Sequence, residues 1–330
     1  MKFHFEFDVK KISTPIAHQH KLLLIGSCFT ENIGEKLRKQ KFQVLENPHG
    51  ILFNPISVTG ALTDYIENKQ YGENDLFEYN EAWHSWHHHS KFSGLSAQES
   101  LDKINASNNQ THAYIKGADF LMITLGSAWT YTLTPNALNA RVGSVAANNH
   151  KAPASWFAKK LLTPEETISA LDNVLYRSSG INPQLQIIFT ISPVRHLREG
   201  VIENNRSKAV LIQAVHTLAE RKDNVYYFPA YELVIDDLRD YRFYAEDLVH
   251  PNYHATQYVW EKFTGACMSD ETRNLMEEIA SINLAFNHKA FNPHSEQHKK
   301  FLRSYYEKTK ALQDKYAYLN FKDELQYFAQ

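Results

Sequence analysis

The sequence has few cysteines, no excess of charge of either sign and no long apolar run. Its 330 residues include only two cysteines, Cys28 and Cys267, which are too far apart to give a disulfide framework or a zinc-binding spacing. Lys and Arg total 35 and Asp and Glu total 37, so the formal net charge is −2. This balance offers no electrostatic basis for binding nucleic acid or an anionic membrane.

Hydrophobic segments are too short to span a membrane. None approaches the roughly 18 uncharged apolar residues that a spanning helix requires. The opening segment MKFHFEFDVKKIS alternates and carries charges, so it lacks the continuous apolar centre of a signal peptide. The cysteine content suits a reducing compartment. We therefore expect a cytoplasmic protein with no membrane partner and no nucleic-acid partner.

The sequence does contain short apolar runs that alternate with longer amphipathic ones, which is typical of parallel βαβ construction. Hydrophobic residues make up 43% of the chain, enough for a sizeable core. The apolar runs predict five strands, at 22–25, 42–45, 120–125, 186–191 and 225–228. Apolar residues three or four positions apart predict helices at 30–39, 163–177 and 206–221.

Two intervals exceed what a minimal sheet needs. Residues 54–118 are predicted to form a long insert rich in Asn, Trp and His. Residues 266–330 are mostly polar and helical, with the clearest helix at 301–316. The length allows one large α/β domain with an appendage. We therefore predict an α/β domain over 1–265 that contains the insert, followed by a helical C-terminal extension.

Small and polar residues follow the predicted strands. Because ligands bind beyond the carboxyl ends of the strands in an open parallel sheet, these residues are expected to share one site. Ser27 follows the first strand and precedes a helical pattern, in the segment LLLIGSCF. A helix N-terminus there would offer N–H groups and a partial positive charge to a developing oxyanion. The alternative is a turn that only requires small residues.

Asp247 and His250 follow the fifth strand, three positions apart. This spacing lets a carboxylate accept from the Nδ1–H of an imidazole, which leaves Nε2 free to take a proton from a serine hydroxyl. A serine hydroxyl needs such a base because it is a poor nucleophile alone. The pair therefore makes Ser27 a candidate nucleophile.

Cys28 is the rival nucleophile. A thiol at a helix N-terminus can have a lowered pKa, which favours the reactive thiolate. Its position next to Ser27 would direct it away from the face that Ser27 presents. A buried Cys more often acts as a small hydrophobe.

These segments resemble the GSCFA-domain family, whose name matches Gly26-Ser27-Cys28-Phe29 and departs at Thr30, where alanine is usual. Further blocks also look like that family: NPHGILFNP at 47–55, TLGSAW at 124–129, SPVRHLREG at 192–200 and a longer one at 227–251. The family is similar to the SGNH/GDSL hydrolases, which have a flavodoxin-like three-layer fold. The resemblance implies a five-stranded parallel sheet of order 2-1-3-4-5 and a serine-dependent ester hydrolase that needs no cofactor.

The resemblance also implies roles for individual residues. Ser27 matches the nucleophile, Asp247 and His250 match the closing pair, and the N–H groups of Ser27 and Gly50 match the oxyanion donors. The third block departs from the pattern, because Ala128 cannot supply the usual asparagine amide. Losing one oxyanion donor typically costs about 100- to 1000-fold in kcat. Candidates for the replacement are Asn54, Ser127 and a histidine of the insert.

The run WHSWHHHS places Trp83 and Trp86 among four histidines. His87 and His89 would share one face of a strand, as two metal ligands could. No carboxylate lies in the run and no HExxH spacing occurs, so we predict no metal site. We interpret the run as a polar aromatic loop over the site, suited to a carbohydrate or another polar ester.

Arg195 and His196 follow the fourth strand and are candidates for binding a substrate anion or supporting the catalytic groups. The alternative for Arg195 is an ion pair with Glu199 or Asp240. Arg242 is expected to tie down the loop that follows it. Three alternatives stay open. They are acyl transfer to an alcohol by the same residues, a binding module without catalysis, and a metal-dependent activity of the histidine cluster, which would require bound metal in the purified protein. The sequence does not indicate the oligomeric state.

Overall fold

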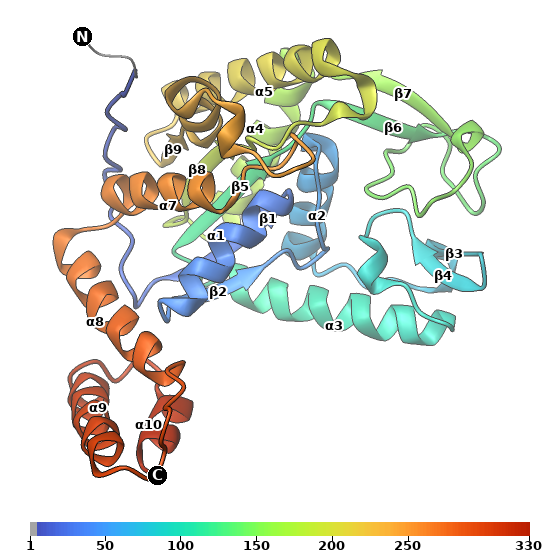
Figure 1. The fold of residues 1–330 in the computed structure, drawn as a ribbon. Coiled ribbons are helices and arrows are strands. Elements are labelled where there is room, and N and C mark those ends of the chain that lie inside the picture. Colours follow the sequence, from blue (N-terminus) through green and yellow to red (C-terminus); the bar gives the residue numbers. More distant parts are fainter. Residues whose placement is uncertain (1–4) are drawn as a thin grey trace.

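The computed structural model describes residues 5–330, except the side chain of Glu199. Its centre is a five-stranded parallel sheet of order β2-β1-β5-β8-β9, shown in Figure 1. The strands are β1 (Lys21–Gly26), β2 (Gln43–Glu46), β5 (Phe120–Leu125), β8 (Gln186–Ile191) and β9 (Val225–Phe228). Numbered along the chain within this sheet, the order is 2-1-3-4-5, so the fold that the family resemblance implied is confirmed.

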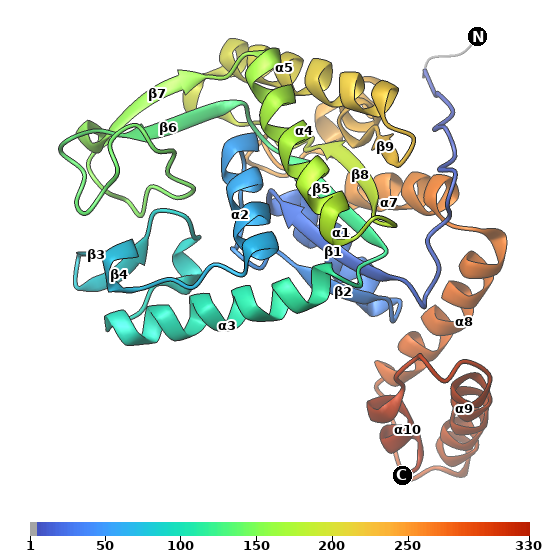
Figure 2. The same cartoon turned by 180° about the vertical axis from the view of Figure 1, so that it is seen from behind.

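Helices cover both faces of the sheet and give the three layers (Figures 1 and 2). One hydrophobic cluster joins the sheet to α2 (Pro55–Glu67), α4 (Pro164–Ile181) and α5 (Val201–Arg221). A second cluster joins the other face to α1 (Cys28–Lys39) and α7 (Tyr253–Cys267). Because β1, β5 and β8 are buried on both faces, their sequences are nearly continuous apolar runs.

The interval between β2 and β5 contains more than a surface insert. Its helix α2 contributes Val58 and Leu62 to the main core. It continues through the hairpin of β3 (Leu76–Tyr79) and β4 (Ala82–Ser85) to α3 (Ala97–Ile115). A second hairpin, β6 (Trp129–Leu133) with β7 (Phe157–Leu161), lies between β5 and α4. The predicted domain boundaries stay a prediction.

The C-terminal segment consists of α8 (Asp270–Phe286), α9 (Glu296–Lys315) and α10 (Lys322–Phe328). These helices extend away from the sheet in Figure 1 and enclose a hydrophobic cluster of their own. Lys41, just after α1, pairs with Glu324 at 2.5 Å, and Asn283 donates to the carbonyl of Lys39 at 2.6 Å. Among residues 5–330, no helix is long and apolar enough to cross a membrane.

Candidate active site

Ser27 sits at the tip of β1 and caps the N-terminus of α1. The preceding Gly26 has φ +142°, and a Cβ there would lie 2.1 Å from the carbonyl oxygen of Thr124, so only glycine fits this turn. Gly26 donates to Asn47 Oδ1 at 2.9 Å, which ties the turn to the loop after β2. Ser27 is 1% exposed, and its Oγ has no hydrogen-bond partner in the described part of the chain. A buried hydroxyl left unpaired in this way is a feature that a functional role would explain.

A small cavity adjoins Ser27 at the carboxyl ends of β1, β5 and β8. A Cβ on Gly126 would lie 3.4 Å from Ser27 Cβ and 3.2 Å from Phe53 Cδ1, so this glycine lets the loop after β5 approach the serine. The cavity measures about 20 Å³, room for roughly one water molecule. Its lining residues are Ser27, Cys28, Phe53, Gly126, Ser192, Val194, Arg195 and His196.

Asp247 and His250 form the expected pair in the loop after β9. The imidazole Nδ1 lies 2.7 Å from Asp247 Oδ2, and the N–H groups of His250 and Val249 donate to Oδ1 at 3.0 and 2.9 Å. These bonds, led by the His250 N–H, lower the pKa of Asp247 to about 2, so the carboxylate is ionised at neutral pH. With Nδ1–H held by the carboxylate, Nε2 is left as the acceptor nitrogen.

Arg195 connects that loop to the cavity. Its backbone N–H donates to Val249 O at 3.2 Å, and its Nη1 donates to Leu248 O at 3.0 Å. The guanidinium also lies 4.2 Å from the ring centre of Tyr244 and 5.0 Å from that of Tyr241. Because Arg195 lines the cavity that contains Ser27, the loop carrying His250 docks at the same edge of the sheet as the serine.

The site is nevertheless not closed in this conformation. Ser27 Oγ makes no hydrogen bond to His250, and the side chains of His250 and Asp247 are 52% and 49% exposed. Catalytic hydrogen bonds are often long before substrate binds. Of the ion-pair partners predicted for Arg195, Asp240 pairs instead with Arg242 at 2.9 Å, and the side chain of Glu199 lies outside the described residues.

The two predicted oxyanion donors are engaged within the protein. The Ser27 N–H donates to Thr124 O at 3.1 Å, and the Gly50 N–H donates to Asn47 O at 2.8 Å. Gly50 has φ +81°, and a Cβ there would lie 2.2 Å from the Cβ of His89, which packs against the loop after β2. Either N–H would therefore have to share its proton or rearrange to serve an oxyanion.

The two side chains offered as replacements for the missing asparagine have local partners. Asn54 caps α2: its Oδ1 accepts from Ser57 N at 2.8 Å and its Nδ2 donates to Ser57 Oγ at 3.0 Å. Ser127 Oγ accepts from Trp129 N at 3.1 Å and lies 3.2 Å from Ser207 Oγ. Both residues therefore shape loops beside the cavity, and neither lines it.

The two tryptophans of the WHSWHHHS run pack against other side chains, Trp86 fully buried and Trp83 half-buried. Trp86 is 4% exposed, stacks on Phe77 with ring centres 3.8 Å apart, and donates from Nε1 to Leu138 O at 3.0 Å. Trp83 packs against a hydrophobic cluster that includes Tyr71 and Leu101. A stacking role toward a ligand needs an open ring face, which Trp86 does not offer. A ligand-stacking role for Trp86 in the predicted polar aromatic loop therefore receives no support from this packing.

Two histidines of the run contact the loop that holds Gly50, and a third is exposed. His88 is buried and stacks on His49 at 4.0 Å, and the His89 N–H donates to His49 O at 2.9 Å, so both support the loop that holds Gly50. His87 is exposed and lines a separate cavity of about 480 Å³ beside α2. Within residues 5–330, no cluster of His, Cys, Asp and Glu side chains has the arrangement of a metal site.

Cys28 lines the same cavity as Ser27, whereas the sequence predicted that it would face away. Burial raises the pKa of the Cys28 thiol, and the negative charge of Glu31 raises it further. The thiol therefore stays protonated at neutral pH, although it lies at a helix N-terminus. This protonation state disfavours Cys28 as a nucleophile.

The sequence predictions missed a row of buried polar residues on α5. Lys208 Nζ donates to Gly126 O at 2.7 Å and to Ser192 O at 2.6 Å. Ser207 Oγ accepts from Ala128 N at 2.7 Å, and Asn204 Oδ1 accepts from His196 N at 2.8 Å. The only sequence signal was polar residues at positions 204, 207 and 208, on the helix face that continues with apolar Leu211 and Val215.

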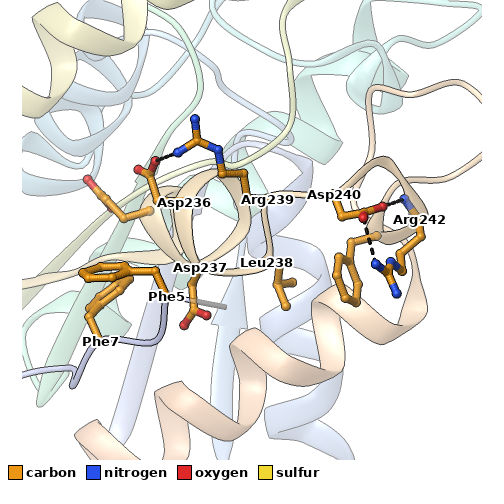
Figure 3. A pocket seen from close by; sticks show the side chains of 10 residues that line it. Phe5, Phe7, Asp236, Asp237, Leu238, Arg239, Asp240 and Arg242 are labelled. Atoms are coloured by element: carbon orange, nitrogen blue, oxygen red, sulfur yellow. Dashed lines mark hydrogen bonds and ion pairs between the residues drawn. The ribbon is translucent and has the colours of Figure 1, made fainter. Parts of the chain in front are cut away.

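A larger cavity, of about 920 Å³, lies beside the π-helix Leu233–Leu238, which follows the short helix α6 (Ala230–Glu232). Figure 3 shows acidic side chains around it, together with Phe5 and Phe7, and Phe243 also lines it. Asp236 pairs with Arg239 at 3.8 Å and Asp240 pairs with Arg242 at 2.9 Å, so these carboxylates are neutralised locally. None of the three predicted catalytic residues lines this cavity.

The sheet order, the helices on both faces and the serine at the first strand tip define a three-layer, flavodoxin-like α/β protein. Comparison with protein families identifies the family to which the chain belongs. The GSCFA family matches residues 21–263, and the GSCFA domain protein, C-terminal domain, matches residues 279–330. The chain belongs to the GSCFA family.

Solved structures with a similar fold come from several sources, whereas no curated protein matched. An acetyl xylan esterase from Butyrivibrio proteoclasticus is 12% identical, with 79% of this chain and 66% of that chain covered and a TM-score of 0.37. A carbohydrate esterase family 3 protein from Talaromyces cellulolyticus is 9% identical, with 80% and 99% covered and a TM-score of 0.35. An alpha/beta hydrolase from the metagenome of Lake Arreo is 15% identical, with 77% and 99% covered and a TM-score of 0.36. At this level of similarity they indicate nothing about the substrate of this chain.

Proposed function

We propose that this protein is a serine-dependent ester hydrolase, with Ser27 as nucleophile, His250 as base and Asp247 as the group that orients His250. The observation that carries the proposal is the docking, through Arg195, of the Asp247–His250 loop at the cavity that contains Ser27. The unpaired Ser27 Oγ and the ionised Asp247 agree with these roles.

The reaction would run in two halves. Ser27 Oγ attacks the ester carbonyl carbon while His250 Nε2 takes the hydroxyl proton, and the leaving alcohol then receives that proton as the tetrahedral intermediate collapses. A water molecule, deprotonated by His250, then attacks the acyl-enzyme. As that intermediate collapses, His250 returns the proton to Ser27 Oγ and the acid is released. The imidazole must first approach Ser27 Oγ, and its half-exposed position leaves room for that movement.

The cavity favours a short acyl group. Its volume of about 20 Å³ accommodates something close to the methyl of an acetyl group, and Phe53 and Gly126 are among the residues that line it. A longer chain would have to displace packed side chains. We therefore propose an acetyl or similarly short ester of a carbohydrate or another polar alcohol. Hydrolysis of p-nitrophenyl acetate should exceed that of the octanoate, and equal rates would contradict the size limit.

A fluorophosphonate probe tests the proposal, because it bonds covalently to an activated serine. The wild-type protein should be labelled, and Ser27→Ala and His250→Ala should each abolish labelling. Cys28→Ala is the matched control: it removes the neighbouring nucleophile in the same cavity and should keep labelling. A folded wild-type protein that stays unlabelled, or a Ser27→Ala variant that is labelled as well as the wild type, would contradict the proposal.

A binding module without catalysis is the second candidate. It is favoured by the burial of Ser27, which is 1% exposed, and by the engagement of both predicted oxyanion donors in backbone hydrogen bonds. Absence of labelling together with binding of an acylated carbohydrate would support it. Acyl transfer by the same residues would show as an ester product when a second alcohol is added during turnover.

A further inference from the structure

Lys208 is a buried cation directly behind the candidate active site. It is 1% exposed, and both of its hydrogen bonds go to backbone carbonyls, those of Gly126 and Ser192. These two residues immediately follow β5 and β8, and both line the cavity that contains Ser27. The ammonium is therefore bonded to the backbone of two residues that line the cavity, and it does not line the cavity itself.

Among the described residues, no carboxylate lies within ion-pair distance of Lys208 Nζ. The groups that act on its charge are the thiol of Cys28, beside Ser27, and the ring of Tyr231, whose centre lies 5.8 Å from Nζ. Burial without a counter-ion disfavours the charged form and lowers the pKa of Lys208 to about 7. A buried, unbalanced cation is costly, so it suits a site where negative charge appears only during the reaction.

The proposed reaction produces such a charge beside Ser27, and the usual donors for it are scarce. Ala128 replaces the asparagine, and its N–H is taken by Ser207 Oγ. The N–H groups of Gly126 and Ser127 both donate to Phe53 O, at 2.8 and 3.0 Å. The loop after β5 thus offers the oxyanion no free N–H group from residues 126–128.

We propose that the Lys208 ammonium supports the transition state by holding the Gly126 and Ser192 carbonyls and by placing a positive charge behind the developing oxyanion. Lys208 is thus a positioning residue that compensates for the absent asparagine. The two carbonyl oxygens are directed at Nζ, so their negative ends are neutralised instead of repelling the oxyanion. This inference rests on the proposed function, because the oxyanion forms on the ester that Ser27 attacks.

Two variants distinguish the effect of the Lys208 charge from the effect of its hydrogen bonds to the two carbonyls. Lys208→Gln keeps an amide that can donate to both carbonyls but removes the charge, and Lys208→Met removes both. The readout is the rate of fluorophosphonate labelling, compared with the melting temperature of each variant. We expect the melting temperature of Lys208→Gln to stay close to that of the wild type. Its labelling rate should fall on the order of tenfold to a hundredfold, a smaller loss than the one caused by removing a direct oxyanion donor.

The pH profile supplies a readout that a purely structural role would not move. In the wild type, labelling should decline as pH rises above about 7, because Lys208 loses its charge there, and Lys208→Gln should lack that decline. If both variants fail to fold, the wild-type profile decides alone: a rate that stays level or rises from pH 7 to 9 overturns the inference. So does a Lys208→Gln variant that labels at the wild-type rate. An unlabelled wild type overturns the proposed function itself, and the inference falls with it.

Discussion

Arg195 Nη1 donates a 3.0 Å hydrogen bond to the carbonyl oxygen of Leu248, and this contact joins the loop after β8 to the loop after β9. Leu248 has φ +56°, a left-handed conformation that a leucine adopts only when its surroundings impose it. It lies between Asp247 and His250, so the conformation of the candidate base depends on a residue held by Arg195. The link makes Arg195 a positioning residue for His250.

Replacing Arg195 by alanine should therefore slow fluorophosphonate labelling by roughly 10- to 100-fold, the cost of a misplaced catalytic group. Arg195→Lys should recover little, because a lysine cannot both donate to Leu248 O and cover the two tyrosine rings. Arg242→Ala is the control, since its ion pair with Asp240 is exposed. A labelling rate for Arg195→Ala equal to that of the control would show that His250 is positioned by other contacts.

Asp247→Asn should reduce labelling by on the order of 10³- to 10⁴-fold, as expected when the carboxylate that sets the imidazole tautomer is lost. The pKa of Asp247 is lowered to about 2, so its contribution is complete above the ordinary value of 3.8 and is lost only as pH falls toward 2. Any loss of labelling between pH 7 and 5 must then come from protonation of another group. An Asp247→Asn variant that labels at the wild-type rate would contradict the orienting role of Asp247.

Gly26→Ala should destabilise the protein by about 3 kcal/mol or more, because the new Cβ meets a backbone oxygen and the φ of +142° is unfavourable for alanine. Gly60→Ala is the matched control: it lies inside α2 with nothing within 4 Å of the new Cβ. The control should stabilise the protein by about 0.5–1 kcal/mol through helix propensity. Urea unfolding measures both changes, and a small loss for Gly26→Ala would mean that the turn can relax.

Trp86→Ala should cost about 3–5 kcal/mol of unfolding free energy, the usual range for a buried aromatic ring. The KM for a p-nitrophenyl ester should stay close to that of the wild type, because the ring packs on Phe77 and does not line the cavity beside Ser27. His87→Ala, at an exposed position of the same run, should change stability by less than about 0.5 kcal/mol. A raised KM with unchanged stability would restore the interpretation of Trp86 as a ligand contact.

The sequence predicted the sheet well because its three central strands, β1, β5 and β8, are buried on both faces. Short apolar runs such as LLLI and FLMITL are typical of buried parallel strands in an α/β protein. The family resemblance supplied the strand order. The spacing of Asp247 and His250 likewise gave their mutual contact, since a short loop leaves few arrangements. These two predictions, which depended on local sequence, therefore agreed with the structure.

Predictions that depended on packing between distant segments did less well. Whether Trp86 faces solvent is decided by Phe77 and Leu138, and nothing in the run itself reveals those partners. Lys208 lies inside the predicted helix 206–221, but it was missed because a lysine on an amphipathic helix is normally solvated. Its burial follows from the meeting of α5 with the ends of β5 and β8, which only the tertiary structure provides.

The separate packing of the C-terminal helices affects how the protein unfolds locally. Their hydrophobic cluster, built around Ile279, Ile282 and Phe321, shares no residue with the clusters that line the sheet. The amide protons of α9 and α10 should therefore exchange with solvent through a local opening of lower free energy than the one that exposes β1 and β5. Such a segment can unfold and refold as an independent cooperative unit while β1, which Ser27 follows, stays folded.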